Sequence, residues 1–154
     1  MGRYRSLIWD HAGFSLVELL VLLVVGGALF SLCLPAFMSY HKNAHVLAAA
    51  SGIAAYLNQG RQLAIQQNQS VCVHIAATAM HYAQGSCAGT VWVGPGTDAT
   101  GNIPAPGGIA LTTTADPVFT NLGAAAPAAT VTVTRGSARL SVIVSASGRV
   151  IVGR

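Results

Sequence analysis

Residues 14–37 read FSLVELLVLLVVGGALFSLCLPAF, and this apolar run decides the fold. Its one charged residue is Glu18. A helix needs about 20 apolar residues to cross the hydrocarbon core of a bilayer, so the run is long enough for a transmembrane or assembly helix. The preceding segment, residues 1–13, carries Arg3 and Arg5. Positive charge beside a span favours a cytoplasmic N-terminus.

Two simpler interpretations of this run are a secretory signal peptide and a plain membrane anchor. The apolar region of a signal peptide spans about 7–15 residues, which is shorter than this run. A plain anchor accounts for the length, but neither interpretation accounts for Glu18. A carboxylate inside an apolar helix costs a few kcal/mol unless it is paired. The sequence therefore predicts a cationic partner for Glu18.

Residues 13–19, GFSLVEL, resemble the processing site of type IV pilins and type II secretion pseudopilins. The resemblance implies that a prepilin peptidase cuts after Gly13 and methylates the new N-terminal residue, Phe14. It also implies that Glu18 supports filament assembly by pairing with the terminal amine of a neighbouring subunit. Residues 1–13 would then be a leader peptide.

Residues 38–68 continue the run as an amphipathic helical segment. Apolar residues recur there at offsets near three and four, which places them on one helix face. They are Val46, Ala49, Ala50, Ile53, Tyr56, Leu57, Leu63 and Ala64. We expect one long helix from about residue 15 to 68, with its second half packed on a sheet.

The end of this segment carries a second, narrower resemblance. Arg61, Ala64, Ile65 and Asn68 fill an Arg-x-x-Ala-Ile-x-x-Asn pattern similar to that of the GspH/FimT branch of minor pilins and pseudopilins. In that branch a helix ending in this pattern runs into a first strand. The resemblance implies an α+β, pilin-like fold.

Residues 69–154 alternate in hydropathy and are rich in turn residues, which predicts a β-rich domain. Residues 94–108 are expected to be a loop and residues 123–129 a linker, because Gly, Pro and Ala dominate them. Strands are predicted at 71–75, 80–82, 90–93, 109–113, 130–134, 140–144 and 149–152. With no helix between them, these strands indicate an antiparallel, sandwich-like region.

The cysteines and one polar loop offer candidate metal sites. Cys72 and Cys87 favour a disulfide in an exported domain over two buried thiols. A zinc set of these cysteines with His74 and His81 lacks a Cys-x-x-Cys element. A calcium loop around Asp98, with Thr97, Thr100 and Asn102, offers one carboxylate, so a turn is favoured. We expect no metal and no cofactor.

A catalytic set is also absent from the sequence pattern. Residues 14–154 contain three carboxylates, which are Glu18, Asp98 and Asp116. No acidic residue is near in sequence to the histidines at 41, 45, 74 and 81. The sequence therefore predicts a protein that is not an enzyme.

The charge balance is mildly basic, with eight Lys and Arg against four Asp and Glu. Four arginines lie near the C-terminus, after the last acidic residue, and they are Arg135, Arg139, Arg149 and Arg154. Some FimT-type minor pilins bind DNA through a C-terminal Gly-Arg-x-Arg element, which Gly148-Arg149 matches in part. Phosphate contacts by these arginines are the alternative to solvated side chains that keep a neutral domain soluble.

These patterns together favour a structural minor pseudopilin or pilin of the GspH/FimT type, in type II secretion or in a type IV pilus. The alternative is a DNA-binding minor pilin acting in natural transformation. The expected location is the bacterial inner membrane, with a single span and the domain at residues 69–154 in the periplasm. The expected partners are other pilin subunits, the prepilin peptidase and methyltransferase, inner-membrane lipids and the assembly platform.

Overall fold

The computed structural model describes residues 15–153, without the side chains at 32–36, 39 and 42. The chain divides after Ser39 into two compact units. One long helix, α1 (Leu16–Gln66), begins in the first unit and ends in the second. This confirms the helix that the sequence predicts from about residue 15 to 68.

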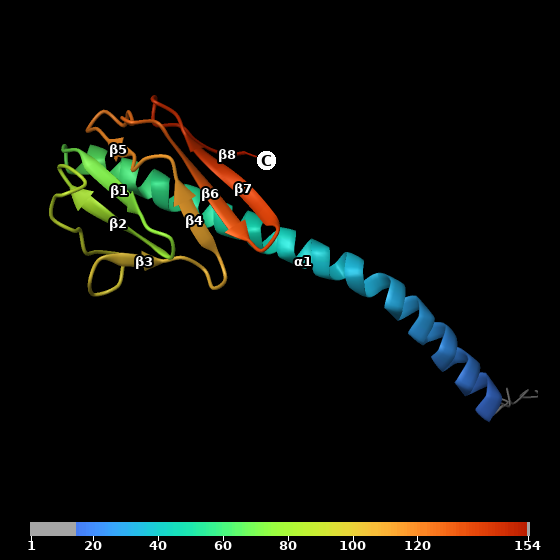
Figure 1. Cartoon of the computed structure of the whole chain (residues 1–154). Helices are drawn as coiled ribbons and strands as arrows, with labels where there is room; N and C mark the ends of the chain where they lie inside the picture. The colour runs from blue at the N-terminus through green and yellow to red at the C-terminus, as the bar shows by residue number, and fades with distance from the viewer. Residues whose placement is uncertain (1–14, 154) are drawn as a thin grey trace, which may run out of the picture. The chain divides into compact units, whose positions relative to one another are not determined.

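Two antiparallel sheets of four strands each make up the rest of the second unit (Figure 1). The first sheet has the order β3-β2-β1-β5 and consists of β3 (Asn102–Pro104), β2 (Ala79–Gln84), β1 (Val71–Ile75) and β5 (Val118–Phe119). The second has the order β4-β6-β7-β8 and consists of β4 (Ala110–Thr113), β6 (Ala129–Arg135), β7 (Ala138–Val144) and β8 (Val150–Gly153). The α+β class is therefore confirmed.

The hydrophobic core lies between the sheets and the part of α1 that follows Ser39 (Figure 1). Strand alternation turns one face of each sheet inward, as the burial of Val131 and Val133 in β6 illustrates. Seven of the eight residues predicted on the buried helix face are buried, namely Val46, Ala49, Ala50, Ile53, Leu57, Leu63 and Ala64. The eighth, Tyr56, is half-buried and packs against this core.

Close contact between α1 and the first sheet depends on Gly60. A Cβ atom at Gly60 would lie 2.8 Å from a methyl group of Val73 and 3.1 Å from the ring of Tyr82. The Tyr82 hydroxyl donates a hydrogen bond to the Tyr56 carbonyl of α1, at 2.9 Å. Burial raises the pKa of this hydroxyl far above its ordinary value, so Tyr82 stays neutral and acts as a donor.

Three short segments differ from the sequence prediction. The strand predicted at 90–93 is wrong, because only Val91 forms an isolated bridge there, to Ala83. β3 lies inside the stretch predicted as loop at 94–108, and β5 was not predicted. β3 and β5 span only three and two residues, so they leave no hydropathy period in the sequence and exist through their pairing with β2 and β1.

Candidate functional site

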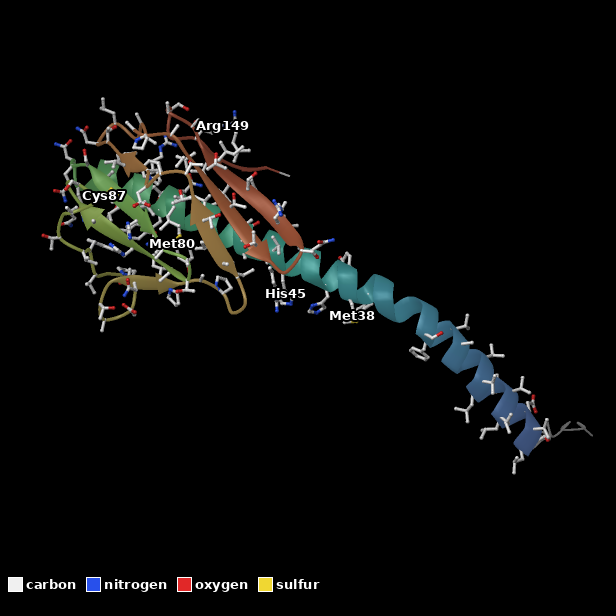
Figure 2. The ribbon with its side chains drawn as sticks, in the orientation of Figure 1. Met38, His45, Met80, Cys87 and Arg149 are labelled. Atoms are coloured by element: carbon white, nitrogen blue, oxygen red, sulfur yellow. A yellow bond between two sulfur atoms is a disulfide. The ribbon has the colours of Figure 1, made fainter. Side chains whose placement is uncertain are left out.

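The first unit of the chain exposes an unusual amount of apolar surface. Side chains project on all sides of this part of α1 (Figure 2). More than half of the surface is exposed for Leu16, Val17, Leu19, Leu20, Val21, Leu22, Leu23, Val24, Val25, Leu29 and Phe30. A helix that is apolar all round is stable only when other apolar groups surround it, so this segment is built to be enclosed.

Glu18 lies in the first turn of this helix. A carboxylate at a helix N-terminus interacts favourably with the unpaired backbone N–H groups there. In the part of the chain that the structure describes, Glu18 forms no ion pair. The predicted cleavage residue Gly13 and the predicted methylated residue Phe14 lie outside the described residues.

No helical stretch among the residues described with their side chains combines the length and the apolar character needed to cross a membrane. The run predicted as a span, residues 14–37, includes positions outside that description. The membrane anchor stays a prediction.

The Arg-x-x-Ala-Ile-x-x-Asn pattern lies where α1 ends and the chain turns into β1. Asn68 has a φ of 51°. The Gln69 N–H donates to the Ala64 carbonyl at 3.2 Å, and the Asn68 N–H donates to the Ile65 carbonyl at 3.3 Å. These two bonds define a Schellman motif with asparagine in the left-handed position. The pattern therefore encodes a helix stop, with Ala64 fully buried beneath it.

Arg61 of the same pattern packs against two turns of the second sheet region. A Cβ atom added at Gly123 would lie 2.8 Å from the Arg61 Nε atom, and one added at Gly148 would lie 3.3 Å from it. This Nε atom is buried and has no hydrogen-bond partner among the described residues. Two glycines with positive φ thus make room for this side chain, which ties the end of α1 to the turns before β6 and β8.

The structure joins Cys72 and Cys87 in a disulfide, the pairing that the sequence favours, with a sulfur–sulfur distance of 1.99 Å. The bridge fastens the loop after β2 to β1. Both thiols of the zinc alternative are thereby used. No group of three or more His, Cys, Asp or Glu within the described residues is arranged to hold a metal ion.

His74 and His81 occupy paired positions on β1 and β2, with ring centroids 4.8 Å apart. His74 Nδ1 lies 2.6 Å from Asp116 Oδ2, and the Ile75 N–H donates to the other oxygen of Asp116 at 3.1 Å. The fold therefore gives His74 an acidic partner that lies 42 positions away in the sequence. No sequence pattern indicated this contact, because it depends on the two-residue strand β5 that follows Asp116.

The pKa of His81 is lowered from its ordinary value. Burial is the largest cause, the charge of His74 adds to it, and Asp116 opposes it. The two imidazoles and the carboxylate thus form one cluster on the first sheet.

The loop around Asp98 is a hydrogen-bonded turn. One oxygen of Asp98 accepts bonds from the Thr100 N–H, the Thr100 hydroxyl and the Asn102 N–H, at 2.9, 2.7 and 2.8 Å. The bond from the Thr100 hydroxyl is the main reason that the pKa of Asp98 is lowered. The carboxylate is therefore engaged by its own loop, which agrees with the turn that the sequence favours over a calcium site.

The four arginines of the DNA alternative do not gather in the described part of the chain. Arg135 and Arg139 lie at the turn between β6 and β7, whereas Arg149 lies beyond the other end of β7, paired with Ser145 (Figure 2). Six residue steps along β7, at about 3.3 Å each, separate Arg139 from Ser145 by roughly 20 Å. Arg154 lies outside the described residues. Among the arginines that the structure describes, no specific geometry supports DNA binding.

The first half of α1 is apolar and exposed, its second half packs on antiparallel sheets, and its first turn carries an acidic residue. These features together define a pilin-like protein. The family model described as "Type II transport protein GspH" matches residues 49–148. The chain belongs to this family. Its members are structural rather than catalytic, and they work with other pilin subunits in a pilus or pseudopilus.

Solved structures have the same fold at low sequence identity. The type IV minor pilin FimU of Pseudomonas aeruginosa is 14% identical, with a TM-score of 0.55 over 75% of this chain and 92% of that chain. The minor pseudopilin EpsH of the Vibrio cholerae type 2 secretion system is 13% identical, with a TM-score of 0.54 over 70% of this chain and 94% of that chain. No curated protein matches by sequence.

Proposed function

We propose that residues 14–154 form a structural minor subunit of a type II secretion pseudopilus or a type IV pilus. The observation that carries the proposal is the exposed apolar first half of α1, with Glu18 as the one charged residue in the run 14–37. Such a helix needs an apolar enclosure. The inner membrane supplies it before assembly, and the packed helices of neighbouring subunits supply it afterwards.

Processing and assembly are linked by charge. Hydrolysis of the peptide bond between Gly13 and Phe14 creates an ammonium group at Phe14. A carboxylate in an apolar medium is costly unless a cation pairs with it. The amine of one subunit therefore pairs with Glu18 of its neighbour, and the strength of this pair in a medium of low dielectric constant fixes the axial register of the two helices.

The remaining parts of the chain have supporting roles. Residues 1–13 are a leader that the prepilin peptidase removes, and the same enzyme methylates Phe14. Residues 40–154 lie in the periplasm, where the disulfide between Cys72 and Cys87 suits the oxidising compartment. The assembly platform extracts the subunit from the membrane lipid.

The test measures processing and incorporation separately in cells that contain the native assembly system. Mass spectrometry of the wild-type protein should find Phe14 as a methylated N-terminus. Glu18→Gln keeps the shape of the side chain and removes its charge. We expect this variant to be cut normally and to lose at least tenfold in sheared filaments, since an ion pair worth about 1.4 kcal/mol or more is absent.

Ser31→Ala is the matched control, because Ser31 lies in the same apolar helix and its hydroxyl donates to the Ala28 carbonyl of that helix. This variant should enter filaments at the wild-type level. An uncut leader in the wild-type protein, or full incorporation of Glu18→Gln, would contradict the proposal.

A further inference from the structure

Each sheet ends in two edge strands, and the chain itself protects three of the four. β3 is three residues long and ends in Pro104, which has no N–H to offer. The outer side of β5 is bonded by the loop after it, since the Ala126 N–H donates to the Val118 carbonyl at 2.9 Å. The outer side of β4 is bonded as well, because the Leu111 N–H donates to the Ala77 carbonyl at 2.9 Å.

The fourth edge, β8, is open. In the described chain, no residue forms a backbone hydrogen bond with the side of β8 that faces away from β7. The Ser145 N–H donates to the Arg149 carbonyl at 2.9 Å, so these two residues form a hydrogen-bonded pair at the end of the ladder between β7 and β8. Val150 and Val152 then direct their N–H and C=O groups outward, since neighbouring pairs in an antiparallel ladder alternate.

This edge lacks two of the devices that prevent strand pairing, which are charge and proline within the strand. Its four residues, Val150–Gly153, include no charge and no proline. Ile151 and its ladder partner Ile143 lie on the outer face of the sheet, with 42% and 41% of their surface exposed. An apolar edge with free backbone groups is a template for another extended strand.

The charges around β8 decide which strand fits. Arg149 precedes the strand and is exposed, Arg154 follows it in the sequence, and no acidic residue comes after Asp116. A second copy of this chain pairing through the same edge would place arginine near arginine. A strand with acidic residues at its ends would place opposite charges together.

We propose that β8 is a docking edge for an extended strand, flanked by acidic residues, from a different subunit. The strand extends the second sheet by one and bonds to the outward backbone groups of Val150 and Val152. The inference rests on the proposed function only in taking the partner to be another filament subunit.

The experiment uses the mature full-length chain in detergent micelles, labelled with nitrogen-15, and measures amide exchange with water by NMR. The probe is a seven-residue peptide of alternating Thr and Val with Asp at both ends. At about 1 mM peptide, near the dissociation constant expected of a short strand, exchange at Val150 and Val152 should slow about twofold. Exchange at Leu111, whose N–H lies on the protected outer edge of β4, should not change.

Two altered peptides serve as controls that leave the protein unchanged. The peptide with N-methylated central residues should have no effect, because it cannot form the ladder, and the peptide with Lys at both ends should protect less. Val152→Pro, which removes one outward N–H, should abolish the effect of the Asp peptide. Its amide spectrum for β6 reports whether it folds.

Unchanged exchange in the presence of the Asp peptide would overturn the proposal. Equal protection by the Lys peptide, or protection that rises with protein concentration without any peptide, would overturn the choice of an acidic strand from another subunit. Neither result bears on Glu18, so failure here is distinct from failure of the proposed function.

Discussion

At the scale of single residues, His81 determines part of the dependence of folding stability on pH. Its pKa in the folded protein is lowered, chiefly by burial and then by His74. The folded state therefore binds fewer protons at His81 than the unfolded state does. Stability should fall as the pH drops below the ordinary pKa of 6.5 and passes through the lowered value. Above pH 7 the effect should vanish.

We expect His81→Gln to lose less stability between pH 7.5 and pH 5 than the wild-type protein, because the glutamine does not titrate. Urea unfolding at the two pH values gives the comparison. His45→Gln is the control, since His45 contacts His41 rather than the cluster with Asp116. An equal loss of stability in wild type and His81→Gln would show that His81 does not contribute.

At the scale of elements, the packing of α1 on the first sheet depends on a missing side chain. Gly60→Ala should lower the free energy of unfolding by about 1–3 kcal/mol, because the new methyl would overlap Val73 and Tyr82. This is opposite to the gain of about 1 kcal/mol that alanine gives in an open helix. Gly52→Ala provides that comparison, since a Cβ at Gly52 meets nothing within 4 Å. Chemical denaturation should separate the two variants in sign.

The end of α1 depends on the left-handed conformation of Asn68. Asn68→Val should cost about 1–2 kcal/mol, because a β-branched residue is strained at positive φ. Asn68→Gly should cost less, since it keeps the backbone relaxed and loses only the bond from the Asn121 amide, at 2.9 Å. Thermal melting of both variants tests the order, and equal melting temperatures would contradict the Schellman assignment.

Elements with their own period could be predicted from the sequence, and elements that exist through pairing could not. The second half of α1 carries a repeat near 3.6 and strands such as β6 alternate strictly, so the sequence predicts both. The segment 90–93 has the composition of a strand, yet its pairing with β2 stops at the single bridge between Val91 and Ala83. The contact of His74 with Asp116 bridges 42 positions and needed the sheet order to appear.

At the scale of the whole molecule, the disulfide closes a loop of the second unit. A cross-link between positions separated by 15 residues stabilises by about 3 kcal/mol through the entropy of the unfolded chain. Replacing Cys72 and Cys87 together by alanine should lower stability by roughly that amount and leave the fold intact. Urea denaturation measures the change. A change below about 0.5 kcal/mol would indicate that the bridge does not constrain the unfolded state.

Described apolar side chains are exposed in the first unit, whereas the second unit has a buried hydrophobic core. This difference predicts that the second unit folds alone. All buried hydrophobic residues in the described chain lie at Val46 or beyond, so the core is contained in residues 40–154. The apolar side chains described before residue 40 are exposed, and none of them is among the buried core residues.

A fragment that begins at Tyr40 should therefore be monomeric in buffer without detergent and should unfold in one cooperative transition, with the disulfide intact. Circular dichroism during heating and sedimentation give the two measurements. The mature full-length chain is the contrast, since its exposed helix should drive association unless detergent covers it. A fragment that unfolds gradually or aggregates would show that the core needs the first half of α1. The exposed apolar helix would then serve to stabilise the domain itself.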